Sequence, residues 1–137
     1  MRLYANVDGS TEFRNPSKRG SAAWILYKDD VEIARGVTVY EGERVSNNEM
    51  ELNSILNLLK HTNQMEEMSF KVIEIRSDSK LAVEILNRNW VCKASNLQPI
   101  VKDIWELCDK IDAEIVFAWL PREKNRLADA LSKSAWK

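Results

Sequence analysis

The alternation of apolar and polar positions near the start of the chain predicts β-strands. Residues 3–8 alternate with a period of two, and this pattern ends at a turn dipeptide. Two further apolar runs, at 22–28 and 31–40, are separated by two aspartates, which is typical of a hairpin. The first part of the chain is therefore expected to form three antiparallel strands.

A change of period after position 46 predicts that helices then alternate with strands. Leu52, Leu56 and Leu59 recur at helical spacing, so a helix is expected to begin near Asn47 and Asn48. The later pattern predicts a strand at 71–76, a short helix after 77–79, a helix from 96 to about 111, a strand at 114–120 and a last helix from about 123. The expected fold class is α/β, with one mixed five-stranded sheet of three antiparallel and two parallel strands, flanked by helices.

Length and composition limit the class of protein. With 137 residues, of which 45% are hydrophobic and 30% charged, we expect a single globular domain spanning 1–137. The apolar runs are far shorter than the ~18 residues of a membrane span, so no membrane association is expected. Cys92 and Cys108 have no metal-binding spacing, which favours free thiols in a reducing, cytoplasmic compartment. A net charge of −1 argues against nonspecific coating of nucleic acid.

Four acidic residues stand where a carboxylate can be directed at a ligand. Asp8 ends the first strand, and Asp78 follows the fourth, at the end where open α/β sheets present binding groups. Glu51 borders the apolar stripe of the first long helix, where an unpaired carboxylate is costly to desolvate. Asp129 lies in the last helix.

Each of these residues also has a structural explanation. Asp8 belongs to a turn dipeptide, and Glu51 lies three positions after Asn48, as in a capping box. Asp78 can cap the helix that follows it, and Asp129 can form an ion pair with a lysine four positions later. The functional argument therefore depends on the four residues as a set.

The segments around these carboxylates resemble the ribonuclease H family, type 1, and within it the compact plant-type or retroelement-like branch that lacks a loop histidine. The resemblance extends from position 4 to 131 and is carried by four segments in the family's order: Asn-Val-Asp-Gly-Ser (6–10), Asn-Asn-Glu-Met-Glu-Leu (47–52), Arg-Ser-Asp-Ser-Lys-Leu-Ala-Val (76–83) and Trp-Leu-Pro-Arg-Glu-Lys-Asn-Arg-Leu-Ala-Asp-Ala-Leu (119–131). It implies a ribonuclease H-like fold.

The resemblance also implies an activity and a set of site residues. The activity is endonucleolytic hydrolysis of the RNA strand of RNA–DNA hybrids by a monomer, leaving 5′-phosphate and 3′-hydroxyl ends. Two Mg²⁺ or Mn²⁺ ions would be held by the catalytic residues Asp8, Glu51, Asp78 and Asp129. The substrate-binding residues it implies are Gly9, Ser10, Thr11, Asn47 and Asn48 on the RNA strand, Arg44, Ser46 and Asn96 on a DNA phosphate, Lys80 beside the cut, and Trp90 on the DNA backbone.

A second hypothesis is a catalytically weak or inert module on the same fold, which binds hybrids or a protein partner. It is motivated by the loop at 121–125, which has no histidine, and by a short basic protrusion at 87–95. Another nuclease or strand-transfer enzyme on this fold is a third hypothesis. For the individual residues, helix capping is the alternative role of Asn47 and Asn48, and a half-buried core position is that of Trp90. The one histidine, His61, is expected at the surface.

Overall fold

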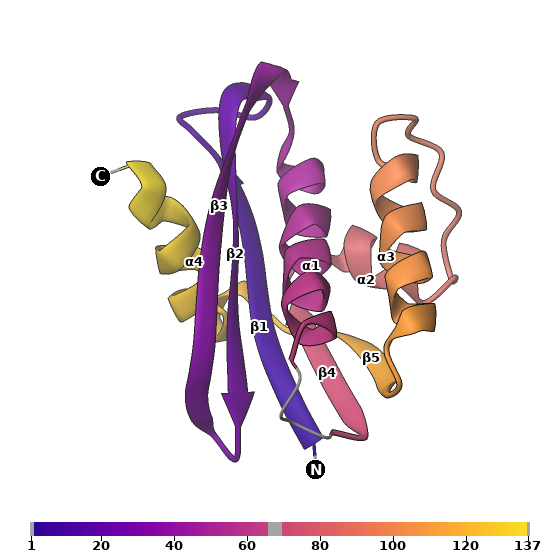
Figure 1. Ribbon diagram of the computed structural model, residues 1–137. Coiled ribbons are helices and arrows are strands. Elements are labelled where there is room, and N and C mark those ends of the chain that lie inside the picture. The colour runs from indigo at the N-terminus through magenta and orange to yellow at the C-terminus, as the bar shows by residue number, and fades with distance from the viewer. Residues whose placement is uncertain (1, 66–69, 137) are drawn as a thin grey trace.

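The structure is a computed structural model that describes residues 2–65 and 70–136, and it contains a mixed five-stranded sheet (Figure 1). The strands are β1 (Arg2–Thr11), β2 (Ser17–Lys28), β3 (Val31–Val45), β4 (Val72–Ser77) and β5 (Glu114–Trp119). Their order across the sheet is β3-β2-β1-β4-β5. The first three strands are antiparallel, while β4 and β5 run parallel to β1, which confirms the predicted fold class.

Helices cover both faces of the sheet (Figure 1). They are α1 (Asn47–Asn63), α2 (Lys80–Leu86), α3 (Gln98–Lys110) and α4 (Arg126–Lys133), with 3-10 turns at Arg122–Lys124 and Ser134–Trp136. The first three lie on one face, and α4 packs on the other, against β1 and β2. Among the described residues, no helix combines the length and apolar character that crossing a bilayer requires.

The hydrophobic core lies between α1 and the sheet. The apolar positions of residues 3–7 on β1 are fully buried and belong to one cluster with Leu52, Leu56 and Leu59 of α1. Full burial of such side chains contributes roughly 1.5–3 kcal/mol each, so this contact fixes α1 over the middle of the sheet. His61, which the sequence places at the surface, is half-buried, and its ring packs against Trp24 with 4.6 Å between centroids.

Several element boundaries differ from the sequence prediction. β2 begins at Ser17 rather than 22, β3 extends to Val45 rather than 40, and α3 begins at Gln98 rather than 96. β1 does not end at Asp8-Gly9 but continues to Thr11, because Ser10 and Thr11 pair with Ser21 and Gly20 of β2. The last helix begins at Arg126 rather than near 123, since residues Arg122–Lys124 form a separate 3-10 turn after Pro121.

Candidate metal centre and active site

Asp8 and Asp78 are placed side by side by the register of two parallel strands. Val7 of β1 is the partner of Ser77, the last residue of β4. The residue that follows each of these two in the chain is an aspartate, so Asp8 and Asp78 lie at the same end of the parallel strand pair. Asp8 is almost completely buried, at 3% exposure, and Asp78 is half-buried.

Glu51 reaches this pair because α1 touches β1 at Gly9. A Cβ atom on Gly9 would lie only 2.2 Å from the carbonyl carbon of Met50 and 2.4 Å from the nitrogen of Glu51. Only a residue without a side chain permits this approach of the two backbones. The close contact brings the carboxyl group of Glu51 next to that of Asp8.

These three carboxyl groups form one cluster that is suited to a hard cation. One oxygen from each of Asp8, Glu51 and Asp78 lies within 4.8 Å of the others. Glu51 is 8% exposed, and its Oε2 has no hydrogen-bond partner among the described residues. Carboxylate oxygens are the ligands that Mg²⁺ and Mn²⁺ prefer, so the donor set fits such an ion.

Burial and mutual repulsion shift the titration of the cluster. Burial raises the pKa of Asp8 to about 7, and the negative charge of Asp78 adds to this shift. The pKa of Glu51 lies well above its ordinary value, first because the group is buried and then because of the charge on Asp8. A site of this kind holds its negative charge at a cost unless a cation is present.

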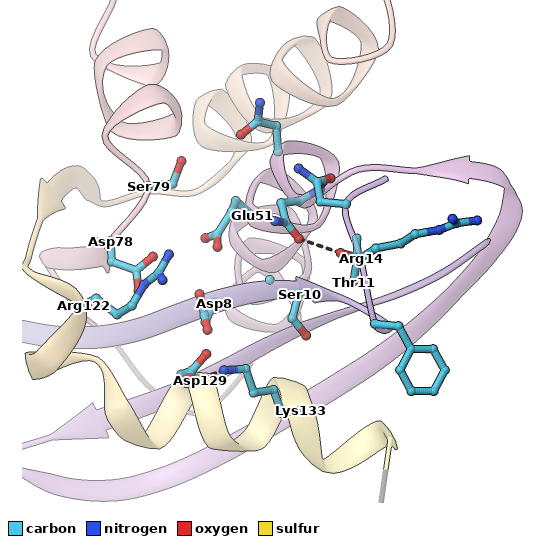
Figure 2. Close-up of a pocket in the computed structure, with 15 residues that line it drawn as sticks. Asp8, Ser10, Thr11, Arg14, Glu51, Asp78, Ser79, Arg122, Asp129 and Lys133 are labelled. Carbon is cyan, nitrogen blue, oxygen red and sulfur yellow. Dashed lines mark hydrogen bonds and ion pairs between the residues drawn. The ribbon is translucent and has the colours of Figure 1, made fainter. Parts of the chain in front are cut away.

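Asp129 approaches the cluster from the opposite side, on α4 (Figure 2). Its Oδ2 forms an ion pair with the Nζ of Lys133 at 3.2 Å, so the expected i,i+4 pair is present. The same carboxyl group lines the cavity that contains Asp8 and raises the pKa of Asp8. Asp129 therefore forms the expected ion pair and also faces the cavity of the acidic cluster.

The other structural alternatives are not found in the structure. The capping box of α1 is formed by Ser46 and Glu49, which leaves Glu51 free to face Asp8. The N-cap of α2 is Ser79, whose Oγ accepts from the backbone nitrogen of Ala82 at 3.2 Å. Glu51 and Asp78 therefore have no capping role.

The four carboxyl groups open into a cavity of about 520 Å³ (Figure 2). Its wall also contains basic side chains, namely Arg14, Arg122 and Lys133. Five residues that the sequence predicted for substrate binding line it as well: Gly9, Ser10, Thr11, Asn47 and Asn48. Thr11 Oγ1 donates to Asn47 Oδ1 at 2.9 Å, which joins β1 to the start of α1 across the cavity.

A buried asparagine that the sequence analysis missed supports this arrangement. Asn125 is 1% exposed, and its Nδ2 donates to the carbonyl oxygen of Val7 at 2.8 Å and to Asp78 Oδ2 at 3.4 Å. It therefore ties the loop before α4 to Val7 within β1 and to Asp78, the residue that follows β4. Its place in the segment that resembles the family, between Pro121 and Asp129, was the only signal in the sequence.

The remaining predicted residues do not line this cavity. Arg44, Ser46 and Asn96 line a second cavity of about 470 Å³, so the structure brings this predicted group together. Lys80, the exposed first residue of α2, lines neither cavity. Trp90 also lies outside both, and at 44% exposure it is not a core residue.

Comparison with solved structures gives close matches over the full chain. RNase H1 from the halophilic archaeon Halobacterium salinarum NRC-1 is 27% identical, with a TM-score of 0.86, over 99% of this chain and 98% of that one. LC11-RNase H1, isolated from compost and solved in complex with an RNA/DNA hybrid, is 19% identical, with a TM-score of 0.87, over 98% of this chain and 99% of that one. The N-terminal RNase H domain of a Mycobacterium tuberculosis protein is 22% identical, with a TM-score of 0.84, over 98% of this chain and 92% of that one.

A family model agrees with these structural matches. Residues 6–135 match the family described as "Reverse transcriptase-like", which is most of the chain and includes all four acidic residues. The matched fold has the same mixed sheet that positions Asp8 and Asp78. The chain therefore belongs to the reverse transcriptase-like family and is a member of the ribonuclease H family.

Proposed function

We propose that the protein is an endoribonuclease that hydrolyses the RNA strand of RNA–DNA hybrids and leaves 5′-phosphate and 3′-hydroxyl ends. The family and the fold support a nuclease. The observation that carries the proposal is the cluster of Asp8, Glu51 and Asp78, in which a buried glutamate oxygen has no partner within the described chain. LC11-RNase H1, which has the same fold, was solved with an RNA/DNA hybrid.

The proposed cofactor is a pair of Mg²⁺ or Mn²⁺ ions. Asp8, Glu51 and Asp78 would hold such ions together with Asp129, and Asp8 lies centrally among the other three. Bound divalent ions supply Lewis-acid stabilisation of the charge that develops on the phosphoryl group. This chemistry needs no serine or cysteine nucleophile. The described residues that line the cavity include no histidine and no cysteine.

The chain's own residues orient these ligands and bind the substrate. Asn125 fixes Asp78 through its Nδ2, and Lys133 fixes Asp129. Arg122 and Arg14 place positive charge in the same cavity, where it attracts the phosphate backbone of the hybrid.

We propose that the RNA strand is recognised through its 2′-hydroxyl groups, which distinguish RNA from DNA. The groups available for this line the cavity and belong to Gly9, Ser10, Thr11, Asn47 and Asn48. Arg44, Ser46 and Asn96 would contact the DNA strand from the second cavity. The exposed side chains of Lys80 and Trp90 would contact the duplex outside these two cavities, and the protein would act as a monomer.

The test uses an end-labelled RNA strand that is presented alone, paired with RNA and paired with DNA. We expect cleavage of the RNA–DNA hybrid only, with Mg²⁺ or Mn²⁺, and none after chelation. An Asp8→Asn variant, shown by circular dichroism to be folded, should cleave about a thousandfold more slowly, because metal ions contribute several kcal/mol and each ~1.4 kcal/mol is tenfold in rate. Folded parent protein that cuts with neither metal would favour a binding module, and an equally fast variant would refute the metal centre.

A further inference from the structure

The second cavity contains a carboxylate that accepts several hydrogen bonds on one oxygen. Glu49 Oε1 accepts from the backbone nitrogen of Ser46 at 3.3 Å, from Ser46 Oγ at 3.1 Å and from Asn96 Nδ2 at 3.1 Å. The contacts from Ser46 belong to the capping box of α1. Asn96 comes from the loop between α2 and α3, 47 residues further along the chain, so the arrangement is more than a local helix cap.

A cationic side chain completes this donor set. Arg44 lines the same cavity, is exposed, and makes no ion pair within residues 2–65 and 70–136. A guanidinium beside several N–H and O–H donors is the combination that binds a phosphate or a carboxylate. The cavity is therefore built for an anion, and the side chain of Glu49 provides one from within the chain.

This cavity adjoins the catalytic one. Asn48 lines both, and Glu51 of the acidic cluster lies two residues after Glu49 on the same helix. A nucleic-acid duplex that places one strand at the acidic cluster therefore brings its backbone close to Arg44, Ser46 and Asn96.

We propose that Glu49 is a built-in competitor for a backbone phosphate of the bound duplex. To bind here, the phosphate must replace Glu49 as the hydrogen-bond acceptor for Ser46 and Asn96. It is also repelled by the negative charge of the Glu49 side chain. Glu49 thereby lowers the affinity for nucleic acid and makes it less dependent on salt. This inference rests on the proposed function and deepens it, since it names a residue that sets how tightly the substrate is held.

Two substitutions separate this role from simple helix capping. A capping box requires an acceptor oxygen rather than a charge, and glutamine serves as well as glutamate. Glu49→Gln therefore keeps the cap and removes the competing charge. Glu43→Gln is the matched control, because Glu43 is exposed on β3 next to Arg44, carries the same charge and has no hydrogen bond to Ser46 or Asn96.

The experiment measures binding of a fluorescently labelled RNA–DNA hybrid by anisotropy over a range of salt concentrations. Both variants are made in the Asp8→Asn background, so that the hybrid stays uncut. We expect Glu49→Gln to lower the Kd about three- to tenfold and to steepen the slope of log K against log salt by about 0.9, as one additional phosphate contact does. Glu43→Gln should change the Kd less than about twofold on the same scale. Adding Arg44→Ala to Glu49→Gln should remove the gain.

The outcomes distinguish this inference from the proposed function. If the parent chain cleaves hybrids while Glu49→Gln binds no tighter than Glu43→Gln, Glu49 is only a cap and the competitor is refuted. If the parent neither binds nor cleaves hybrids, the proposed function fails and the competitor fails with it. Glu49→Ala frees the same donors without a substitute acceptor, so it should also tighten binding. A Glu49→Ala variant that is folded and binds no tighter than the parent contradicts the proposal.

Discussion

Two glutamates of α1, Glu49 and Glu51, lie two residues apart and have opposite surroundings. Glu49 Oε1 accepts three hydrogen bonds from neutral donors. Glu51 is buried beside two aspartates, and its Oε2 has no donor among the described residues. A buried carboxylate oxygen without a hydrogen-bond donor is costly, and such groups occur where a ligand supplies the missing charge. The comparison shows that the surroundings of a carboxylate, more than its position in the sequence, determine whether it accepts hydrogen bonds within the fold or is available to bind a cation.

The largest expected difference between the two glutamates is in catalysis. Glu51→Gln removes a proposed metal ligand and should lower kcat on an RNA–DNA hybrid by about a thousandfold, because several kcal/mol of transition-state stabilisation is lost. Glu49→Gln should change kcat/KM only a few fold and in the upward direction. Steady-state cleavage assays of both variants test this difference. Equal losses of activity in the two would contradict the assignment of separate roles.

The same two variants should differ in how much a divalent metal ion stabilises the folded protein. An ion that binds only the folded state at a hundred times its Kd adds about 2.7 kcal/mol to the free energy of unfolding. We expect Mg²⁺ or Mn²⁺ to raise the Tm of the parent and of Glu49→Gln, measured by differential scanning calorimetry. The rise should be much smaller in Glu51→Gln. A metal-independent Tm in the parent would refute the ion site.

The pH dependence of metal-free stability should show the repulsion in the acidic cluster. The pKa of Asp8 is raised to about 7 in the folded protein, so the neutral carboxyl stabilises the fold below about pH 4, and this contribution is lost as pH rises through about 7. In EDTA, the free energy of unfolding of the parent should therefore fall relative to Asp8→Asn between about pH 5 and pH 8, by on the order of 2 kcal/mol. Urea unfolding at each pH measures this difference, and a constant difference would refute the shift.

The fold was predictable from sequence because it leaves local patterns, whereas the acidic residues were singled out as a set by the family resemblance of the segments around them. Alternation near the N-terminus and the leucine spacing in 52–59 mark which faces are buried, and burial of those faces fixes the sheet and α1. The register of β1 and β4 then places Asp8 beside Asp78. The sheet and its helices follow from short-range periodicity and the rules for strand connection, whereas this register is seen only in the structure.

The details of the site were not predictable, because they depend on contacts between distant segments. The sequence placed a capping box at Asn48 and Glu51, whereas Ser46 and Glu49 form it with the same spacing two residues earlier. Asp8-Gly9 matches a turn dipeptide, but the glycine instead lets α1 approach a continuing strand. Nothing in the local sequence indicates that the donors of Asn125 and Asn96 reach Asp78 and Glu49 across the fold.

The smallest expected effect is on the stability of the metal-free fold, where the two glutamates should differ in sign. Glu49→Ala removes the acceptor for Ser46 and Asn96 and should lower the free energy of unfolding by about 0.5–1 kcal/mol, as the loss of a cap does. Glu51→Gln removes a desolvated charge that faces Asp8 and should raise the free energy of unfolding in EDTA near pH 8. Urea unfolding of both variants and the parent measures these changes. Destabilisation of similar size in both would mean that Glu51 is satisfied within the protein, and the contrast from which the metal centre is inferred would be lost.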